Sequence, residues 1–291
     1  TESLIISKLN NISDLKEKVL IVIPIINNYK IFKDSFYNKN NLENRKSETI
    51  SLVRSLDVDV LDVLTIKINK FSSAYLFNKN SLDCILKLIQ KLKINLLIID
   101  FQLSPIQQRN LEIFFKVKVI DRTQVILEIF SSRAISNEGK IQVELAALNF
   151  QKTRLVRSWT HLERQRGGSG FLGGPGERQI ELDRRIINKN IKNLNASLQK
   201  VVKTRSIQNS KRKNSSSIIV SLVGYTNTGK STLFNNLTNS SVISKNMLFA
   251  TLDPTLRLMK HEMSYKNKII LSDTVGFISS LPTELVESFK S

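Results

Sequence analysis

Residues 218–232 have the spacing of a phosphate-binding loop between a strand and a helix. An apolar run ends at Gly224, and after four further residues the chain continues Gly229-Lys230-Ser231, which is the pattern GxxxxGKS. Glycines let the backbone turn its N–H groups toward phosphate oxygens, and a following helix adds partial positive charge at its N-terminus. Lys230 can reach the β- and γ-phosphates, and the Ser231 hydroxyl can bind Mg²⁺. The pattern predicts a nucleoside-triphosphate site.

The second half of such a site lies further along the chain. Residues 268–272 have the character of a buried strand that ends at Asp273, the first residue of Asp273-Thr274-Val275-Gly276. A carboxylate at this strand end can hold Mg²⁺, directly or through water. The backbone N–H of Gly276 can then contact a γ-phosphate. The DxxG pattern is weak alone and becomes specific when it follows GxxxxGKS at this distance.

The segment between these motifs includes residues 249–255, FATLDPT. A threonine here is expected to complete the Mg²⁺ shell when a triphosphate is bound. We favour Thr251 for this role, with Thr255 as its rival. An ordinary Pro-containing connection is the remaining alternative.

The charge of the 291-residue chain favours a polyanionic partner. Lys and Arg number 44 against 25 Asp and Glu, a net charge of +19. The excess is concentrated in residues 151–213, which hold 16 Lys and Arg against 4 Asp and Glu. The only cysteine, Cys84, is expected in a core, which favours a reducing cytoplasm over a disulfide framework. No apolar run approaches the roughly 20 residues of a membrane span, so we expect none.

Strand-like and helix-like segments alternate over residues 1–135, which predicts a parallel sheet covered by helices. Ser81 is predicted as the N-cap of one helix, and Ser104-Pro105 as the start of another. Asp100 and Asp121 each end a strand, and we interpret both as solvated acids rather than site residues. The expected strands cover residues 19–26, 58–68, 95–101 and 116–121, and the expected helices cover 42–56 and 122–133 and begin at 81 and 104.

Two long helices are predicted next, over residues 138–165 and 177–203. Each has a narrow apolar edge in steps of three and four, which is the spacing of paired helices. A loop joins them, so we predict an antiparallel hairpin. Residues 206–217 are polar and basic and are predicted to form a linker. The apolar edges consist of Ile141, Leu145, Leu148, Leu155, Trp159 and Leu162 in the first helix and Ile180, Ile187, Ile191, Leu194, Leu198 and Val201 in the second.

The loop between these helices, residues 166–178, is too rich in glycine for a simple turn. Five glycines fall in residues 167–174, and ordering them costs conformational entropy. Phe171 can stack on a base, and arginines flank the loop. We therefore favour RNA binding by this tip over a mobile loop with no partner. The expected RNA-binding residues are Arg164, Arg166, Phe171, Arg178, Arg184 and Arg185.

Four sequence blocks together resemble the HflX family of ribosome-associated GTPases. The blocks are GGSGFLGGPGERQIELDRR, GYTNTGKST, LFATLDPTLR and DTVGFISSLP, and they occur in the family's order. The resemblance implies a factor that binds the large ribosomal subunit and splits or rescues stalled ribosomes. The expected α/β fold has a parallel-sheet subdomain at 1–135, a helical hairpin with a Gly-rich tip at 136–205, a linker at 206–217 and a partial Ras-like P-loop GTPase domain at 218–291.

The resemblance also implies the ligands and the site. It implies GTP and GDP, Mg²⁺, and the large subunit with its RNA as partners of a cytoplasmic monomer. Mg²⁺ is expected on Ser231, Thr251 and Asp273, and Lys230 is the expected catalytic residue. The expected nucleotide-binding residues are Gly224, Tyr225, Thr226, Asn227, Thr228, Gly229, Lys230, Ser231, Thr232, Phe249, Ala250, Thr251, Asp273, Thr274, Val275 and Gly276.

Two positions refine the expected hydrolysis. Phe277 stands where Ras-like enzymes that position water with a side chain have Gln. An apolar ring cannot orient water, so intrinsic hydrolysis is expected to be slow. Asn227 stands where related GTPases that use potassium have Asn, which makes K⁺ a second expected ion.

The chain departs from the Ras-like pattern after residue 276. The later Asn-Lys-x-Asp motif that selects guanine does not follow before Ser291. We therefore expect a truncated chain, with an exposed sheet edge and apolar surface in its last domain. Two other functions stay open: an RNA- or ribosome-binding module without productive nucleotide turnover, and a P-loop protein that uses ATP.

Overall fold

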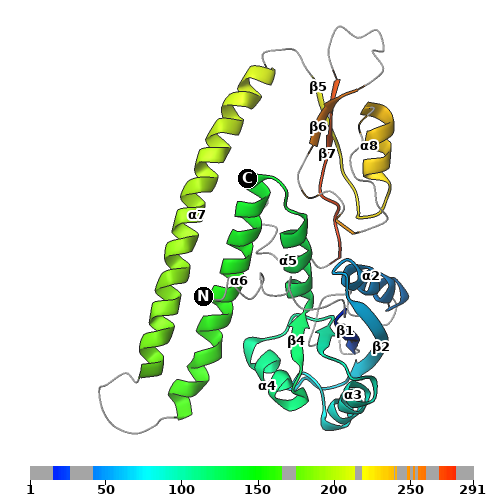
Figure 1. Cartoon of the computed structure of the whole chain (residues 1–291), viewed down its shortest axis with the longest axis vertical. Coiled ribbons are helices and arrows are strands. Elements are labelled where there is room, and N and C mark those ends of the chain that lie inside the picture. The colour runs from blue at the N-terminus through cyan, green and yellow to red at the C-terminus, as the bar shows by residue number, and fades with distance from the viewer. Residues whose placement is uncertain are drawn as a thin grey trace.

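The computed structural model describes residues 16–26, 42–165, 175–213, 218–238, 240, 248–249, 252, 255–259 and 269–279. Figure 1 shows three parts within these ranges: a larger sheet with helices around it, two long helices side by side, and a smaller sheet with a short helix beside it.

The larger sheet is parallel throughout, with the strand order β2-β1-β3-β4. A helix connects each strand to the next one along the chain, which confirms the predicted parallel α/β arrangement. We call this unit, β1 to α5, the N-terminal subdomain. Its elements are β1 (Lys18–Ile26), α2 (Leu42–Arg54), β2 (Asp59–Ile68), α3 (Lys79–Leu92), β3 (Leu96–Ile99), α4 (Pro105–Phe115), β4 (Lys118–Asp121) and α5 (Arg122–Arg133).

The core lies on both faces of this sheet, because successive side chains of a strand point to opposite faces. Val19 and Ile21 of β1 belong to a cluster with residues of α2 and α5. Leu20 and Val22 belong to a second cluster with residues of α3 and α4. Burial on both faces explains why β1 is apolar along most of its length instead of alternating.

Two local predictions in this subdomain are wrong. Helix α3 begins at Lys79, and its N-cap is Asn78, whose side chain accepts a hydrogen bond from the Ser81 N–H at 2.9 Å. Asn caps as well as Ser, and here Asn78 takes the role three residues before the predicted Ser81. Cys84 is exposed, because α3 buries only the stripe that contains Leu82, Ile85 and Ile89.

The prediction of solvated acids at Asp100 and Asp121 is also wrong. Both carboxylates are buried, because helices that carry arginines cover the ends of their strands. Asp100 accepts from Arg45 Nε at 2.6 Å and from Arg122 Nη1 at 2.8 Å. Asp121 accepts from Arg154 Nη2 at 2.5 Å and from the Gln124 N–H at 2.9 Å, which caps α5.

Two long helices follow, α6 (Asn137–Gln165) and α7 (Pro175–Lys213), and they form the predicted antiparallel hairpin (Figure 1). Along the outer helix α7, the predicted apolar positions from Ile187 to Val201 are half-buried while most neighbours are exposed. The buried face of α6 is wider than predicted, because α6 also packs against α4 and α5. Near the open end, Arg205 pairs with Glu138 at 2.6 Å.

The predicted linker begins later than expected. Helix α7 continues to Lys213, so residues 206–213 are helical, and residues 214–217 lie outside the described residues. Residues 206–213 contain no Gly or Pro to end the helix. Ser206 and Ser210 hydroxyls donate to carbonyls one turn back, those of Lys203 and Ser206. No helix in the described part of the chain has the length and apolar character of a membrane-spanning segment.

The smaller sheet consists of β5 (Ile218–Leu222), β6 (Thr255–Leu258) and β7 (Ile269–Asp273), in the order β5-β7-β6. Strand β5 is parallel to β7, and β6 is antiparallel to it. Helix α8 (Lys230–Thr238) follows β5 and lies beside the sheet (Figure 1). Among the described strands β5 is at an edge, and its Ile218 and Ile219 are each 48% exposed.

Candidate functional site

The phosphate-binding loop, residues 223–229, connects β5 to α8 as the motif requires. Asn227 and Gly229 have positive φ angles of 61° and 82°, which turn the backbone back on itself. Thr228 Oγ1 donates to the Tyr225 carbonyl at 2.8 Å and closes the turn. The loop ends at the first residue of α8, where backbone N–H groups and the helix dipole favour an anion.

Lys230 and Ser231, the expected phosphate and Mg²⁺ ligands of the loop, are the first residues of α8. Lys230 Nζ donates to the Tyr225 carbonyl at 2.5 Å. Burial lowers the pKa of Lys230, and the charge of Asp273 partly opposes this. Ser231 Oγ donates to Asp273 Oδ2 at 2.7 Å, and Asp273 is fully buried at the end of β7. Two of the three expected Mg²⁺ ligands, Ser231 and Asp273, therefore lie side by side.

The segment after β7, residues 274–279, pairs with the phosphate-binding loop. The Phe277 N–H donates to the Gly224 carbonyl at 3.1 Å, and the Thr226 N–H donates to the Phe277 carbonyl at 2.8 Å. A Cβ at Gly276 would lie 2.7 Å from Thr226 Cα, so only glycine fits here. Thr274 Oγ1 donates to the Leu222 carbonyl at 2.6 Å.

The structure describes part of the expected switch segment 249–255. Phe249 is buried, has a φ of 56°, and packs edge-on against Phe130 of α5 with ring centroids 4.6 Å apart. Ala250 and Thr251 lie outside the described residues. Thr255, the rival to Thr251, is paired with Asp273 across β6 and β7, and its buried Oγ1 has no hydrogen-bond partner among the described residues.

The remaining expected nucleotide-binding residues cluster in the same region. Thr232 is exposed in the first turn of α8, and Val275 packs against the cluster that contains α5. The chain fold thus brings the GxxxxGKS and DxxG motifs together. Their roles toward a nucleotide stay predictions.

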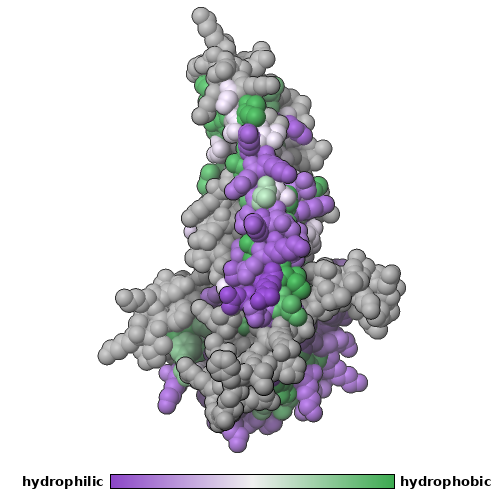
Figure 2. All heavy atoms as spheres, turned by 90° about the vertical axis from the view of Figure 1, so that its left-hand side faces the viewer, coloured by the Kyte–Doolittle hydropathy of each residue, from purple (hydrophilic) through white to green (hydrophobic). Residues whose placement is uncertain are grey.

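Only two of the expected RNA-binding side chains lie among the described residues. Arg184 and Arg185 are exposed on α7, and Arg185 pairs with Glu181 one turn back at 2.5 Å. Figure 2 shows hydrophilic side chains gathered along this helix. The side chains of Arg164, Arg166, Phe171 and Arg178 lie outside the described part.

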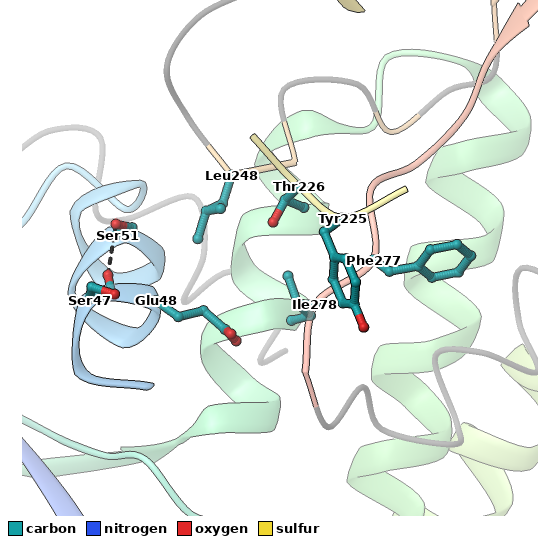
Figure 3. A pocket seen from close by; sticks show the side chains of 8 residues that line it. All are labelled: Ser47, Glu48, Ser51, Tyr225, Thr226, Leu248, Phe277 and Ile278. Atoms are coloured by element: carbon teal, nitrogen blue, oxygen red, sulfur yellow. Dashed lines mark hydrogen bonds between the residues drawn. The ribbon is translucent and has the colours of Figure 1, made fainter. Parts of the chain in front are cut away.

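The sequence interpretation missed the contacts between this site and the N-terminal subdomain. Arg122 Nη2 donates to the Ser279 carbonyl at 2.9 Å and also pairs with Glu48 of α2. A cavity of about 230 Å³ lies between α2 and the loop (Figure 3). The one signal in the sequence for these contacts was the basic Arg122, which directly follows the strand-end Asp121. Ser47, Glu48, Ser51, Tyr225, Thr226, Leu248, Phe277 and Ile278 line the cavity.

A strand, glycine turn and helix with a lysine, together with a serine hydroxyl on a strand-end carboxylate, define the class of P-loop nucleotide-binding proteins. Three family models match consecutive parts of the chain: "GTP-binding GTPase N-terminal" over residues 43–131, "GTP-binding GTPase Middle Region" over 133–212 and "50S ribosome-binding GTPase" over 219–291. The chain belongs to the HflX family of GTPases.

Individual relatives agree with this assignment. GTPase HflX of Magnetococcus marinus is 48% identical over 242 residues, which cover 83% of this chain and 55% of the relative. GTPase HflX of Escherichia coli K12 is 46% identical over 241 residues, or 83% and 56%. The chain thus spans about half the length of the curated relatives that it matches. A crystal structure of the SsGBP and GDP complex shares the fold, with a TM-score of 0.50, 24% identity, and coverage of 94% of this chain and 67% of that one.

Proposed function

We propose that this chain binds and hydrolyses GTP and acts as a factor that binds the large ribosomal subunit and splits or rescues stalled ribosomes. The observation that carries the nucleotide part is the arrangement of Lys230 at the phosphate-binding loop with Ser231 on Asp273. Membership of the HflX family, and the "50S ribosome-binding GTPase" model over residues 219–291, support the GTP and ribosome parts.

The residues at the end of β7 fit a Mg²⁺ ion. Mg²⁺ prefers oxygen ligands and is held by one or two protein groups together with substrate phosphates. The Ser231 hydroxyl and the Asp273 carboxylate supply oxygens within 2.7 Å of each other. The ion would neutralise charge on the β- and γ-phosphates. Thr251 remains the proposed third protein ligand, and Thr255 remains its rival.

The nucleotide site requires Lys230 to change partners. Its Nζ lies on the Tyr225 carbonyl, within the same loop that would hold the phosphates. A bound triphosphate offers charged oxygens, which are stronger acceptors for an ammonium group than a neutral carbonyl. Lys230 therefore moves from Tyr225 to the phosphates and stabilises the charge that develops there during hydrolysis.

The hairpin is the proposed RNA-binding part of the molecule. Exposed basic side chains follow α7, and its lysines and arginines suit contacts to RNA phosphates. The ends of α6 and α7 that flank the Gly-rich tip lie far from the smaller sheet (Figure 1), so the tip and the nucleotide site can contact different parts of one large partner. The exposed described side chains are Arg184, Arg185, Lys189, Lys192, Lys200, Lys203 and Arg205.

Potassium is a further proposed cofactor, through Asn227 at the turn of the loop. If it acts there, GTP hydrolysis is faster in KCl than in NaCl at equal ionic strength, and Asn227→Ala removes the difference. Equal rates in the two salts would exclude this role.

A titration tests the guanine site itself. The chain is titrated with a fluorescent GTP analogue and Mg²⁺, and then competed with GTP and with ATP. Selective displacement by GTP supports the proposed function. Equal displacement by both nucleotides favours an ATP-using protein or a nonselective site, and no binding favours the alternative, an RNA-binding module without nucleotide turnover.

A ribosome-splitting assay distinguishes the proposed GTPase from an RNA-binding module without nucleotide turnover. Lys230→Ala should abolish nucleotide-dependent splitting of ribosomes, measured by light scattering, because Lys230 holds the phosphates. Binding to the large subunit through the hairpin should persist in this variant. Splitting that survives Lys230→Ala would contradict a role for nucleotide hydrolysis.

A further inference from the structure

The position after the DxxG glycine, where Ras-like enzymes that position water with a side chain have Gln, is apolar in this chain. Phe277 follows the DxxG glycine and is held there by two backbone hydrogen bonds to the loop, at 3.1 and 2.8 Å. Its ring cannot accept a hydrogen bond from the water that attacks the phosphate. The hydrogen-bond acceptor for that water must therefore come from another residue of the chain.

The cavity between α2 and the loop is in the right place to hold that water. Its walls include Thr226 of the phosphate-binding loop and Phe277 after the DxxG glycine. We expect these two positions to lie on either side of the γ-phosphate. At about 230 Å³ it has room for several waters, since one water occupies roughly 30 Å³ in the liquid. The opposite wall is α2 of the N-terminal subdomain, which contributes Ser47, Glu48 and Ser51.

Among the described residues that line this cavity, Glu48 is the only carboxylate. Figure 3 shows its side chain extending from α2 toward Tyr225 and Ile278. The two serines are less suited, because Ser47 Oγ donates to the Asn44 carbonyl and Ser51 Oγ to the Ser47 carbonyl, each at 2.8 Å.

Arg122 holds this carboxylate in place, and its positive charge offsets the negative charge of Glu48. The guanidinium pairs with Glu48 Oε1, donates to Asp100 Oδ1 at 2.8 Å and donates to the Ser279 carbonyl at 2.9 Å. The pair therefore ties Glu48 to the backbone just after Phe277. Charge from Arg122 also lowers the repulsion between Glu48 and a triphosphate.

We propose that Glu48 of the N-terminal subdomain is the catalytic residue that positions the attacking water, in the role that Phe277 cannot fill. The water oxygen bonds to the γ-phosphorus while the bond from that phosphorus to the β,γ-bridging oxygen breaks. GDP leaves with the electron pair, and the proton that the water loses ends on the released phosphate. Glu48 accepts a hydrogen bond from the water during this step. The proposal rests on the proposed GTP hydrolysis.

The test compares Glu48→Gln with wild type in single-turnover GTP hydrolysis at saturating nucleotide and Mg²⁺. We expect a rate at least about tenfold lower, because an amide is a weaker and differently directed acceptor. The dissociation constant for a fluorescent non-hydrolysable GTP analogue should change by less than about twofold. Glu43→Gln, an exposed residue on the same helix, is the matched control and should hydrolyse GTP at the wild-type rate.

A second variant keeps the carboxylate at this position. Glu48→Asp keeps the negative charge but shortens its reach, so it too should hydrolyse GTP slowly. Wild-type rates in both Glu48 variants, or parallel losses of rate and nucleotide affinity, would overturn the proposal and leave GTP hydrolysis standing. A wild-type chain that binds but does not hydrolyse GTP would instead overturn the proposed function, and the role of Glu48 with it.

Discussion

At the residue scale, the site is arranged around groups that bond to one another where a nucleotide would bind. Lys230 lies on the Tyr225 carbonyl and Ser231 on Asp273, so the donors expected to contact phosphate and Mg²⁺ already have acceptors within the loop and the strand end. Nucleotide binding then exchanges hydrogen bonds rather than creating them from isolated groups. Such exchange would leave the Lys230 and Ser231 donors hydrogen-bonded in both states.

The lowered pKa of Lys230 should make the proposed nucleotide binding depend on pH. The nucleotide-free protein loses the Lys230 proton at a lower pH than an ordinary lysine does, because burial disfavours the charged form. Bound phosphates favour the charged form, so binding takes up a proton there, and affinity should fall as the pH rises through the lowered pKa. The measurement is the dissociation constant of a fluorescent GTP analogue between pH 7 and 10. Lys230→Arg stays protonated, so its nucleotide affinity should not fall over this pH range. An equal fall of affinity with pH in both proteins would contradict the role of Lys230.

At the element scale, the switch segment depends on α5 as well as on its own sheet. Phe249 and Phe130 form one edge-on pair inside the core cluster that also contains Leu248, Leu252 and Ile278. Residues that precede β6 and residues that follow β7 are therefore buried against the N-terminal subdomain. Movement of these segments upon nucleotide binding requires repacking of that shared core.

Removal of this aromatic pair should destabilise the chain. Phe130→Ala removes a buried ring and should lower the free energy of unfolding by about 3–5 kcal/mol in urea titrations. Ile113→Ala on α4, where the side chain is 64% exposed, should change it by less than about 0.5 kcal/mol. A double-mutant cycle with Phe130→Leu and Phe249→Leu should give a coupling of about 0.5–1.5 kcal/mol. A coupling near zero would show that the rings do not meet in solution.

The attachment of α6 to the sheet should depend on pH when Arg154 is removed. Burial raises the pKa of Asp121, and Arg154 opposes the rise. In Arg154→Ala the pKa of Asp121 rises further, so its ionised form destabilises the folded state more as the pH increases above the unfolded pKa. The destabilisation should reach about 3 kcal/mol near pH 8 and shrink as the pH falls toward 5. Urea unfolding at both pH values, with exposed Glu144→Ala as control, checks this. An equal loss of unfolding free energy in Arg154→Ala at both pH values would contradict this prediction.

At the scale of the whole molecule, the hairpin carries a basic surface along its outer helix α7. Its two helices pack along the half-buried edge of α7, which leaves the arginines and lysines of that helix facing outward (Figure 2). The N-terminal subdomain contacts both α6 and the DxxG segment, through Arg154 on Asp121 and Arg122 on Ser279. It therefore connects the proposed RNA-binding part to the proposed nucleotide site.

Loss of two exposed arginines on α7 should weaken binding to the large ribosomal subunit. Arg184→Ala with Arg185→Ala removes two charges, so the affinity should fall. The slope of log affinity against log salt concentration should become less steep, by the amount expected for the loss of about two phosphate contacts. The measurement is subunit binding at several KCl concentrations. Lys87→Ala with Lys91→Ala, which removes two exposed charges from α3, is the matched control and should bind as wild type. Equal losses in both double variants would point to total charge rather than the hairpin.

Local patterns determined most of the fold. The alternation of apolar runs and amphipathic segments predicted the parallel subdomain, and the heptad-like edges predicted the hairpin, because each depends on residues a few positions apart. The GxxxxGKS spacing likewise predicted the strand, loop and helix that the structure contains, since a phosphate-binding turn is formed within one short segment. The polar stretch after Ser206 was misinterpreted because composition alone does not end a helix that lacks Gly and Pro.

Only the tertiary structure decided which distant residues meet. Asp100 and Asp121 are buried because arginines from α2, α5 and α6 cover them, and no spacing along the chain records those pairs. The same holds for Glu48, which lies far from Phe277 in sequence and lines the same cavity. The P-loop motifs were determined by sequence because their geometry is local. Their contacts with the N-terminal subdomain were decided by packing, because those contacts form between surfaces that come together only when the chain has folded.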